Sequence, residues 1–204
     1  MKRLNGAWFA YWILFLVFEV SIVAYIQQYD RFDQMRIINN WHILPVDNLF
    51  RGLTFLGELL VPIALLIYFV LKKKAWIKPF VFSYASSTLI VQGLKHLVFP
   101  NALRPYAYFK ALDIPWYLVK GVEMNEYNSF PSGHTAAAWF CFIWVALLFK
   151  KPWAGVVAGL LATGVALSRV YLFQHFPIDV AFGAFIGMIC SSIFYYLYHE
   201  TLTK

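Results

Sequence analysis

Charged residues are scarce in this chain of 204 residues, at 13% of the composition, where soluble domains carry about a quarter. Hydrophobic residues make up 61% and aromatic residues 20%. This composition excludes an ordinary soluble domain and predicts an integral membrane protein. Cysteine is also scarce: Cys141 and Cys190 both lie in apolar runs, which excludes a disulfide framework. No internal repeat is visible, and we expect one membrane domain over residues 1–204.

The formal net charge of +7 does not form a nucleic-acid-binding pattern. Such proteins place Lys and Arg along one stripe, whereas here the basic residues gather in short loops between apolar segments. Basic loops of this kind fix the orientation of a membrane protein, because they stay on the cytoplasmic side. We therefore expect no nucleic-acid partner.

Six segments meet or approach the length of about 20 apolar residues that a membrane-spanning helix needs. They are residues 7–26, 53–71, 79–99, 135–149, 153–167 and 177–198. We therefore predict an all-α fold, a bundle of six transmembrane helices. The fourth and fifth segments are short, and they reach the required length only if they include His134 and residues 168–172. Polar residues thus fall at the ends of these two helices.

Two connections between the predicted spans have features of their own. Residues 27–52 interleave charged and apolar side chains, which predicts a short interfacial helix that ends at Pro45. Residues 100–130 form the longest polar stretch and contain Arg104 followed by a proline and several aromatic residues. Because long loops in compact domains are usually functional or disordered, and the aromatic content argues against disorder, we expect a functional loop.

The basic residues divide the six-span arrangement into two faces. One face carries the N-terminal end, the second and fourth loops and the C-terminal tail, with Lys2, Arg3, Lys72, Lys73, Lys74, Lys78, Lys150, Lys151 and Lys204. By the positive-inside rule this face is cytoplasmic, with both termini. The outer face then receives three separate elements of the sequence, with Arg104, His134, Arg169, His175 and Asp179.

The ionisable residues of the outer face lie mainly in two short motifs. One is Pro-Ser-Gly-His at residues 131–134, and the other is Ser-Arg, five residues, His, three residues and Asp at residues 168–179. Arginine offers paired donors to phosphate oxygens, and a helix N-terminus offers free backbone N–H groups. Glycine lets the backbone approach a ligand closely. We therefore predict a phosphate site where Ser132 and Gly133 begin a helix.

The two histidines suit a covalent route of phosphate transfer. A histidine can act as the nucleophile when a carboxylate orients its other ring nitrogen, and Asp179 follows His175 by four residues, about one helical turn. This assigns His175 as nucleophile, Asp179 as its orienting partner and His134 as general acid. No metal is required. A zinc site is the alternative, but the histidines lack ligand spacing on one helix, and the nearby arginines would repel a cation.

The motifs resemble the signature of the type 2 phosphatidic acid phosphatase (PAP2) superfamily of membrane phosphatases. Its second and third parts match here without a gap or substitution, and the resemblance covers about the whole chain. In the first part, eight residues separate Lys95 from Arg104, where the family usually has six. The resemblance implies the roles just given to the histidines and the aspartate. It also implies a set of phosphate-binding residues: Lys95, Arg104, Ser132, Gly133 and Arg169.

The resemblance further implies a lipid phosphatase of the cell inner membrane, acting on a phosphate monoester or diphosphate at the outer face. The implied substrates are undecaprenyl diphosphate, phosphatidylglycerophosphate, phosphatidic acid and the phosphates of lipid A. We expect no cofactor and no obligatory protein partner. Haloperoxidases carry a related site that holds vanadate, but they are soluble proteins. The apolar composition of this chain argues against a haloperoxidase.

Two other functions stay open at this point. A lipid phosphotransferase would form the same phospho-histidine but transfer its phosphoryl group to an acceptor headgroup instead of to water. A transporter or channel would also hold polar residues, although transporters tend to place them near the membrane midplane. Two further acids, Glu19 and Glu58, fall within the first and second predicted spans. Glu58 is placed to orient a site arginine or lysine, and neither acid is included in the predicted site.

Overall fold

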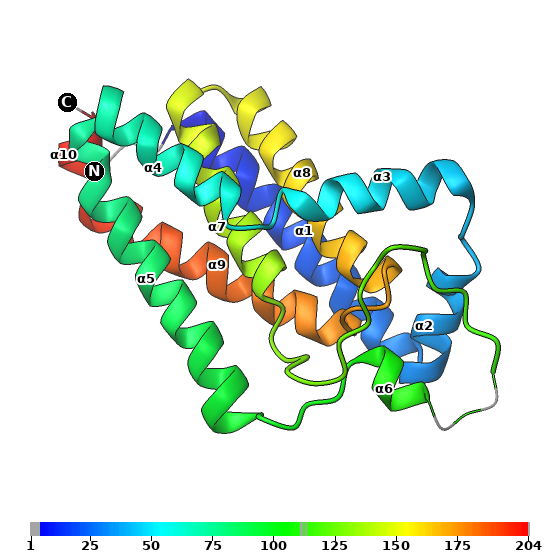
Figure 1. The fold of residues 1–204 in the computed structure, drawn as a ribbon. Coiled ribbons are helices and arrows are strands. Elements are labelled where there is room, and N and C mark those ends of the chain that lie inside the picture. Colours follow the sequence, from blue (N-terminus) through cyan, green and yellow to red (C-terminus); the bar gives the residue numbers. More distant parts are fainter. Residues whose placement is uncertain (1–4, 111, 113, 204) are drawn as a thin grey trace.

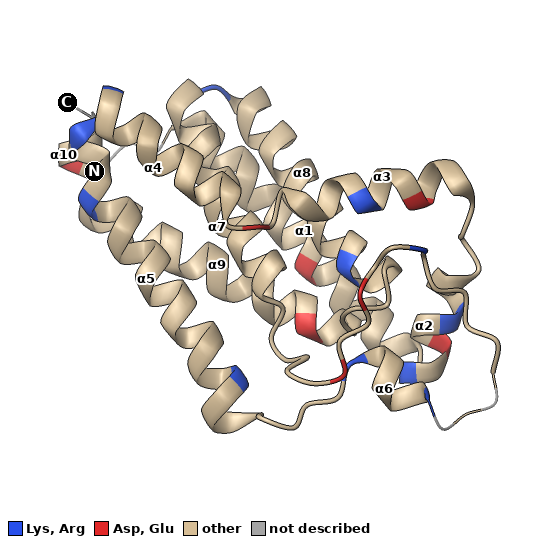
Figure 2. Cartoon of the chain, in the orientation of Figure 1, with Lys and Arg blue, Asp and Glu red and all other residues tan. Residues whose placement is uncertain are grey.

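The computed structural model describes residues 5–110, 112 and 114–203, and every regular element in this part of the chain is a helix (Figure 1). The predicted all-α class is therefore confirmed. Lys2, Arg3 and Lys204, which entered the charge count, lie outside the described residues. Figure 2 shows the lysines of the α4–α5 turn and of the α7–α8 connection at the end of the bundle where both termini lie.

Several helices have the length and composition of membrane spans. Among the described residues, α1 (Gly6–Gln28), α8 (Pro152–Tyr171) and α9 (Pro177–Leu197) each qualify alone. The pair α3 (Leu44–Phe55) and α4 (Leu60–Lys72), bent by 44°, qualifies as a fourth span when it is taken together. The helix α7 (Gly133–Phe149) is apolar but has only 17 residues. The chain is thus a membrane protein, and the number six stays a prediction.

The second predicted span, residues 53–71, is wrong as a single helix. The chain breaks between α3 and α4, and α3 begins at Leu44, well before the predicted start. Pro45, which we expected to end an interfacial helix, instead lies in the first turn of α3. A proline is favourable there, because the first-turn N–H groups have no partner within the helix. The short helix expected in this region is α2 (Arg31–Asn39).

The long connection between the third and fourth predicted spans is mostly irregular. The helix α5 (Ile77–Gly93) follows the short turn Lys74–Trp76 and passes into the π-helical turn Leu94–Val98. Among the described residues between that turn and α7, the regular element is α6 (Pro105–Phe109). The last helix of the described residues is α10 (His199–Thr203).

The helices α7 and α9 pack backbone against backbone near their N-terminal ends. A Cβ atom added to Gly183 would lie 2.4 Å from the carbonyl oxygen of Ser132, and one added to Gly187 would lie 2.2 Å from that of Ala136. Small residues at such positions allow close helix contact. The backbone N–H of Ser132 also donates to the carbonyl of Asp179 at 2.9 Å. The start of α7 is therefore held directly beside the start of α9.

A buried carboxylate joins α3 to the end of α8. Asp47 accepts hydrogen bonds from the Tyr171 hydroxyl at 2.5 Å and from the Tyr117 hydroxyl at 3.0 Å, and it faces Nδ1 of His42 at 2.8 Å. A buried charge needs such partners to offset its lost hydration. Because Tyr171 follows Arg169 by two residues, this cluster fixes α3 next to the predicted site.

Candidate active site

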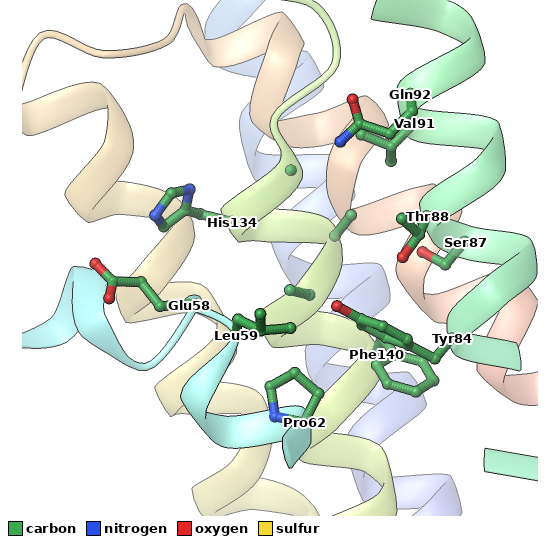
Figure 3. A pocket seen from close by; sticks show the side chains of 14 residues that line it. Glu58, Leu59, Pro62, Tyr84, Ser87, Thr88, Val91, Gln92, His134 and Phe140 are labelled. Atoms are coloured by element: carbon green, nitrogen blue, oxygen red, sulfur yellow. The ribbon is translucent and has the colours of Figure 1, made fainter. Parts of the chain in front are cut away.

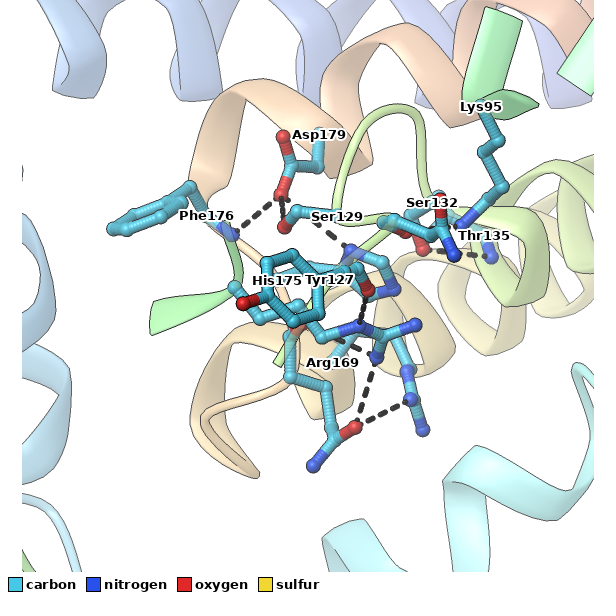
Figure 4. A network of polar contacts seen from close by, with 12 residues as sticks. Lys95, Tyr127, Ser129, Ser132, Thr135, Arg169, His175, Phe176 and Asp179 are labelled. Carbon is cyan, nitrogen blue, oxygen red and sulfur yellow. Dashed lines mark hydrogen bonds and ion pairs between the residues drawn. The ribbon is translucent and has the colours of Figure 1, made fainter. Parts of the chain in front are cut away.

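The predicted nucleophile is buried between two helices. His175 lies in the short connection between α8 and α9 and is 1% exposed, and its Nδ1 lies 3.4 Å from Oδ2 of Asp179 in the first turn of α9 (Figure 4). Burial, followed by the positive charges of Arg104 and Arg169, lowers the pKa of His175 well below its usual value. The imidazole is therefore neutral near pH 7. A proton on Nδ1, the ring nitrogen nearest Asp179, would leave the free lone pair on Nε2.

Further hydrogen bonds fix the Asp179 carboxylate. Its Oδ2 accepts from the Ser129 hydroxyl at 2.5 Å and from the backbone N–H of Phe176 at 2.9 Å. Ser129 lies two residues before the Pro-Ser-Gly-His motif and Phe176 lies inside the motif at residues 168–179, and neither was included in the predicted site. Ser129 gives no signal in the sequence, because nothing in its surroundings marks it as the partner of a residue fifty positions away.

The two predicted phosphate-binding arginines meet at one glutamine. Nη1 of Arg104 donates to Oε1 of Gln174 at 3.0 Å, and Nη2 of Arg169 lies 3.5 Å from the same oxygen. The amide of Gln174 in turn donates to the carbonyl of Glu123 at 2.9 Å. Arg169 also donates to the hydroxyl of Thr54 on α3 at 2.5 Å. Gln174 thus brings together two guanidinium groups from separate parts of the chain, and sequence reasoning missed it.

Lys95 belongs to the same cluster in spite of its unusual spacing. It lies in the π-helical turn after α5, is 8% exposed, and donates from Nζ to the carbonyl of Asn128 at 2.6 Å. Arg104 donates from Nε to the neighbouring carbonyl, that of Tyr127, at 2.9 Å. One loop therefore holds both cations just before the Pro-Ser-Gly-His motif.

The Pro-Ser-Gly-His motif forms the start of α7, as predicted. Ser132 is the N-cap, and its hydroxyl accepts from the backbone N–H of Thr135 at 3.4 Å. The N–H groups of the first helical turn have no partner within a helix, which makes them donors for an anion. A Cβ atom on Gly133 would meet only Val91, at 3.8 Å, so the space beside its backbone is open.

His134 lies close enough to Lys95, Arg104, Arg169 and His175 to interact with each of them electrostatically. The structure therefore brings the predicted catalytic and phosphate-binding residues to one end of α7, α8 and α9. The described residues contain no group of three or more His, Cys, Asp or Glu side chains placed to hold a metal ion. The arrangement combines several cations, a helix N-terminus and two imidazoles. These groups are suited to binding an oxyanion.

Comparison with known proteins identifies the family. Residues 76–202 match the model of the PAP2 superfamily, and the chain belongs to it. Among curated relatives, a lipid A 4′-phosphatase of Bacteroides thetaiotaomicron is 32% identical over 88 residues, which is 43% of this chain and 39% of that protein. A putative undecaprenyl-diphosphatase of Escherichia coli, YbjG, is 40% identical over 62 residues, 30% of this chain and 31% of that one. The matched segments thus span less than half of these relatives.

Two solved structures share the fold over most of their length. The crystal structure of Aquifex aeolicus LpxE aligns with a TM-score of 0.67 and 30% identity, over 83% of this chain and 97% of that one. The PAP2-type phosphatidylglycerolphosphate phosphatase of Bacillus subtilis aligns with a TM-score of 0.68, over 95% and 96%, at 21% identity. The second likeness concerns the fold alone.

The cluster of cations predicts that an anion stabilises the folded protein. Lys95, Arg104 and Arg169 repel one another, and phosphate at the site would relieve that repulsion. At a phosphate concentration of 100 times the Kd, we expect about 2.7 kcal/mol of stabilisation, which raises the melting temperature of the detergent-solubilised protein by several degrees. Differential scanning fluorimetry in phosphate and in chloride of equal ionic strength measures the shift. An equal shift in both salts would contradict a specific anion site.

A second prediction concerns Gln174. The change Gln174→Leu keeps much of the side-chain volume but removes the oxygen that both arginines face. We expect KM for a phosphorylated substrate to rise about tenfold with a smaller change in kcat, because the cations remain but are no longer pre-positioned. Steady-state kinetics of phosphate release measures both constants. The matched control is Gln28→Leu at the exposed end of α1, and a loss confined to kcat would argue against a positioning role.

Proposed function

We propose that this protein is an integral-membrane lipid phosphatase that works through a phospho-histidine at His175. The observation that carries the proposal is the buried, neutral His175 next to Asp179, with Arg104 and Arg169 beside it. Membership of the PAP2 superfamily and the similarity to proteins named as lipid phosphatases support it.

The first half of the proposed reaction forms the covalent intermediate. Lys95, Arg104, Arg169, and the backbone of Ser132 and Gly133 bind the phosphate oxygens. Nε2 of His175 attacks the phosphorus, and a P–N bond forms as the P–O bond to the lipid breaks. His134 gives its proton to the departing oxygen, so that a monoester leaves as the lipid alcohol and a diphosphate leaves as the lipid monophosphate.

The second half regenerates the enzyme. His134, now neutral, takes a proton from a water molecule that attacks the phosphorus. The P–N bond breaks, inorganic phosphate leaves, and His175 returns to its neutral form with Nδ1 still directed at Asp179. The basic side chains already neutralise the charge on the phosphate oxygens, so the reaction as proposed needs no metal and no cofactor.

The proposed substrate is amphiphilic, since a cavity beside His134 lies between apolar helices of a membrane protein. Undecaprenyl diphosphate, phosphatidylglycerophosphate, phosphatidic acid and the phosphates of lipid A are the candidates. We place the protein in the cell inner membrane as one domain, residues 1–204, without an obligatory protein partner. The proposed six spans are α1, the bent pair α3 and α4, α5, α7, α8 and α9, with both termini cytoplasmic and the site at the outer face.

Phosphate release by the purified protein tests the function. The protein in detergent micelles containing EDTA is incubated with each candidate lipid, and inorganic phosphate is counted. We expect release from at least one lipid without any added acceptor. Release that appears only with an acceptor alcohol would instead indicate a phosphotransferase, and no release under either condition would overturn the proposal.

A further inference from the structure

A cavity of about 380 Å³ opens beside His134, between α4, α5 and α7 (Figure 3). Glu58, in the break between α3 and α4, lines it on the side of His134. Polar side chains of α5 line the opposite side: Ser87, Thr88 and Gln92. The cavity thus has a carboxylate on one wall and neutral hydrogen-bonding groups on the other.

Glu58 is held at this place by the residue before it. A Cβ atom on Gly57 would lie 2.8 Å from the carbonyl oxygen of His134 and 2.9 Å from Cγ1 of Val165, so only glycine lets the break press against the start of α7. The break is therefore packed tightly against the proposed proton donor. Glu58 follows directly and lies beside His134 in the lining of the cavity (Figure 3).

The sequence placed Glu58 to orient a site arginine or lysine, and the structure brings it near Arg169 without a hydrogen bond between the two side chains. The two groups interact electrostatically, but the guanidinium donates to Thr54 and faces Gln174. Within the described part of the chain, the structure records no hydrogen bond to the Glu58 carboxylate. This exposed carboxylate is thus available to a molecule in the cavity.

We propose that Glu58 selects the leaving group: it favours phosphate monoesters on headgroups that carry a hydroxyl group, and it disfavours lipid diphosphates. The inference rests on the proposed function. Because His134 protonates the departing oxygen, the leaving group must lie on the side of His134, in the cavity that Glu58 lines. A hydroxyl group there donates to the carboxylate, and its oxygen accepts from the polar groups of α5.

A diphosphate places its second phosphate in that same position. The leaving group then brings its own negative charge next to the Glu58 carboxylate, and like charges at short range weaken binding. The phosphate that is transferred still meets the cations on the other side of His134. The carboxylate therefore discriminates between substrates without touching the phosphorus.

The test is Glu58→Gln, which removes the charge and keeps the shape of the side chain. We expect the ratio of kcat/KM for farnesyl diphosphate to that for farnesyl phosphate to rise about tenfold relative to the unchanged protein. In the same variant, the preference for lysophosphatidic acid, which has a free hydroxyl group, over oleyl phosphate should fall severalfold. Phosphate release is measured for all four lipids.

The control is Glu200→Gln in α10, which removes the same charge outside the cavity and should leave both ratios unchanged. An equal loss on every substrate would show that Glu58 acts on Arg169 instead, and unchanged ratios would exclude any selection; either result overturns the inference. If size-exclusion chromatography shows that Glu58→Gln is misfolded, Glu58→Ala is measured in its place. These outcomes differ from failure of the proposed function itself. In that case the unchanged protein would release no phosphate from any lipid.

Discussion

Replacing His175 by glutamine is expected to abolish phosphate release, with kcat reduced about ten-thousandfold or more. The glutamine fills much of the buried site but offers no lone pair that can form the P–N bond, so the reaction loses its covalent route. Release of inorganic phosphate from the preferred lipid measures the loss. Because the proposed phosphate-binding cations remain, the variant should still be stabilised by inorganic phosphate in a melting experiment.

The matched control is His96→Gln, because His96 is an exposed imidazole one residue after Lys95 and lies outside the proposed machinery. It should retain activity close to that of the unchanged protein. A direct readout is also available: brief incubation with radiolabelled substrate and quenching in base should trap an acid-labile label on the unchanged protein and none on His175→Gln. A stable label on the variant, or persistent turnover, would show that another residue is the nucleophile.

Replacing His134 by glutamine is expected to lower release from lipid substrates about a hundred- to ten-thousandfold, the usual contribution of a general acid. The alkoxide of a lipid is a poor leaving group and needs the proton. p-Nitrophenolate leaves without one, so the first step with p-nitrophenyl phosphate should change much less. Stopped-flow measurement should show a rapid burst of nitrophenolate followed by slow turnover, because attack by water on the phospho-enzyme also needs His134.

The burst amplitude makes this prediction specific. It should approach one nitrophenolate per protein molecule, since the phospho-histidine accumulates when its hydrolysis is slow. Equal losses for the lipid and the nitrophenyl ester, without a burst, would mean that His134 binds phosphate and does not move a proton. The double variant with His175→Gln should show no burst at all.

The motifs predicted which side chains the structure brings together better than the apolar segments predicted the helices that carry them. Two motifs with fixed spacing marked His134, Arg169, His175 and Asp179, because chemistry restricts which residue types can bind and attack a phosphate. The structure brings these residues together. Their roles remain predictions for the kinetic experiments above.

Gln174 and Thr54 were missed for a physical reason. Both are ordinary neutral polar residues, and each gains its importance from a partner distant in the sequence. Gln174 does fall inside the motif at residues 168–179, directly before His175, so its place next to the proposed nucleophile is the only signal that the sequence offers.

The break between α3 and α4 could not be read from composition either. Residues 53–71 are apolar nearly throughout, which favours one continuous helix. The break is instead associated with a tertiary contact, the close approach of Gly57 to the backbone of His134. A contact between residues so far apart leaves no local periodicity, and the end of α3 was therefore joined to α4 in one predicted span, while its start was assigned to the connection 27–52.

Gly183 and Gly187 have no side-chain functional group, yet the contact between α7 and α9 makes both of them important for the proposed chemistry. Gly183 and Gly187 leave room for the carbonyl oxygens of the neighbouring helix, and this room sets how near the start of α7, with His134, lies to the start of α9 beside His175. Any side chain there would push the two helices apart, and with them the proposed proton donor and the proposed nucleophile. Under the proposed mechanism, the geometry of proton transfer depends on atoms that are absent from α9 as much as on the imidazoles themselves.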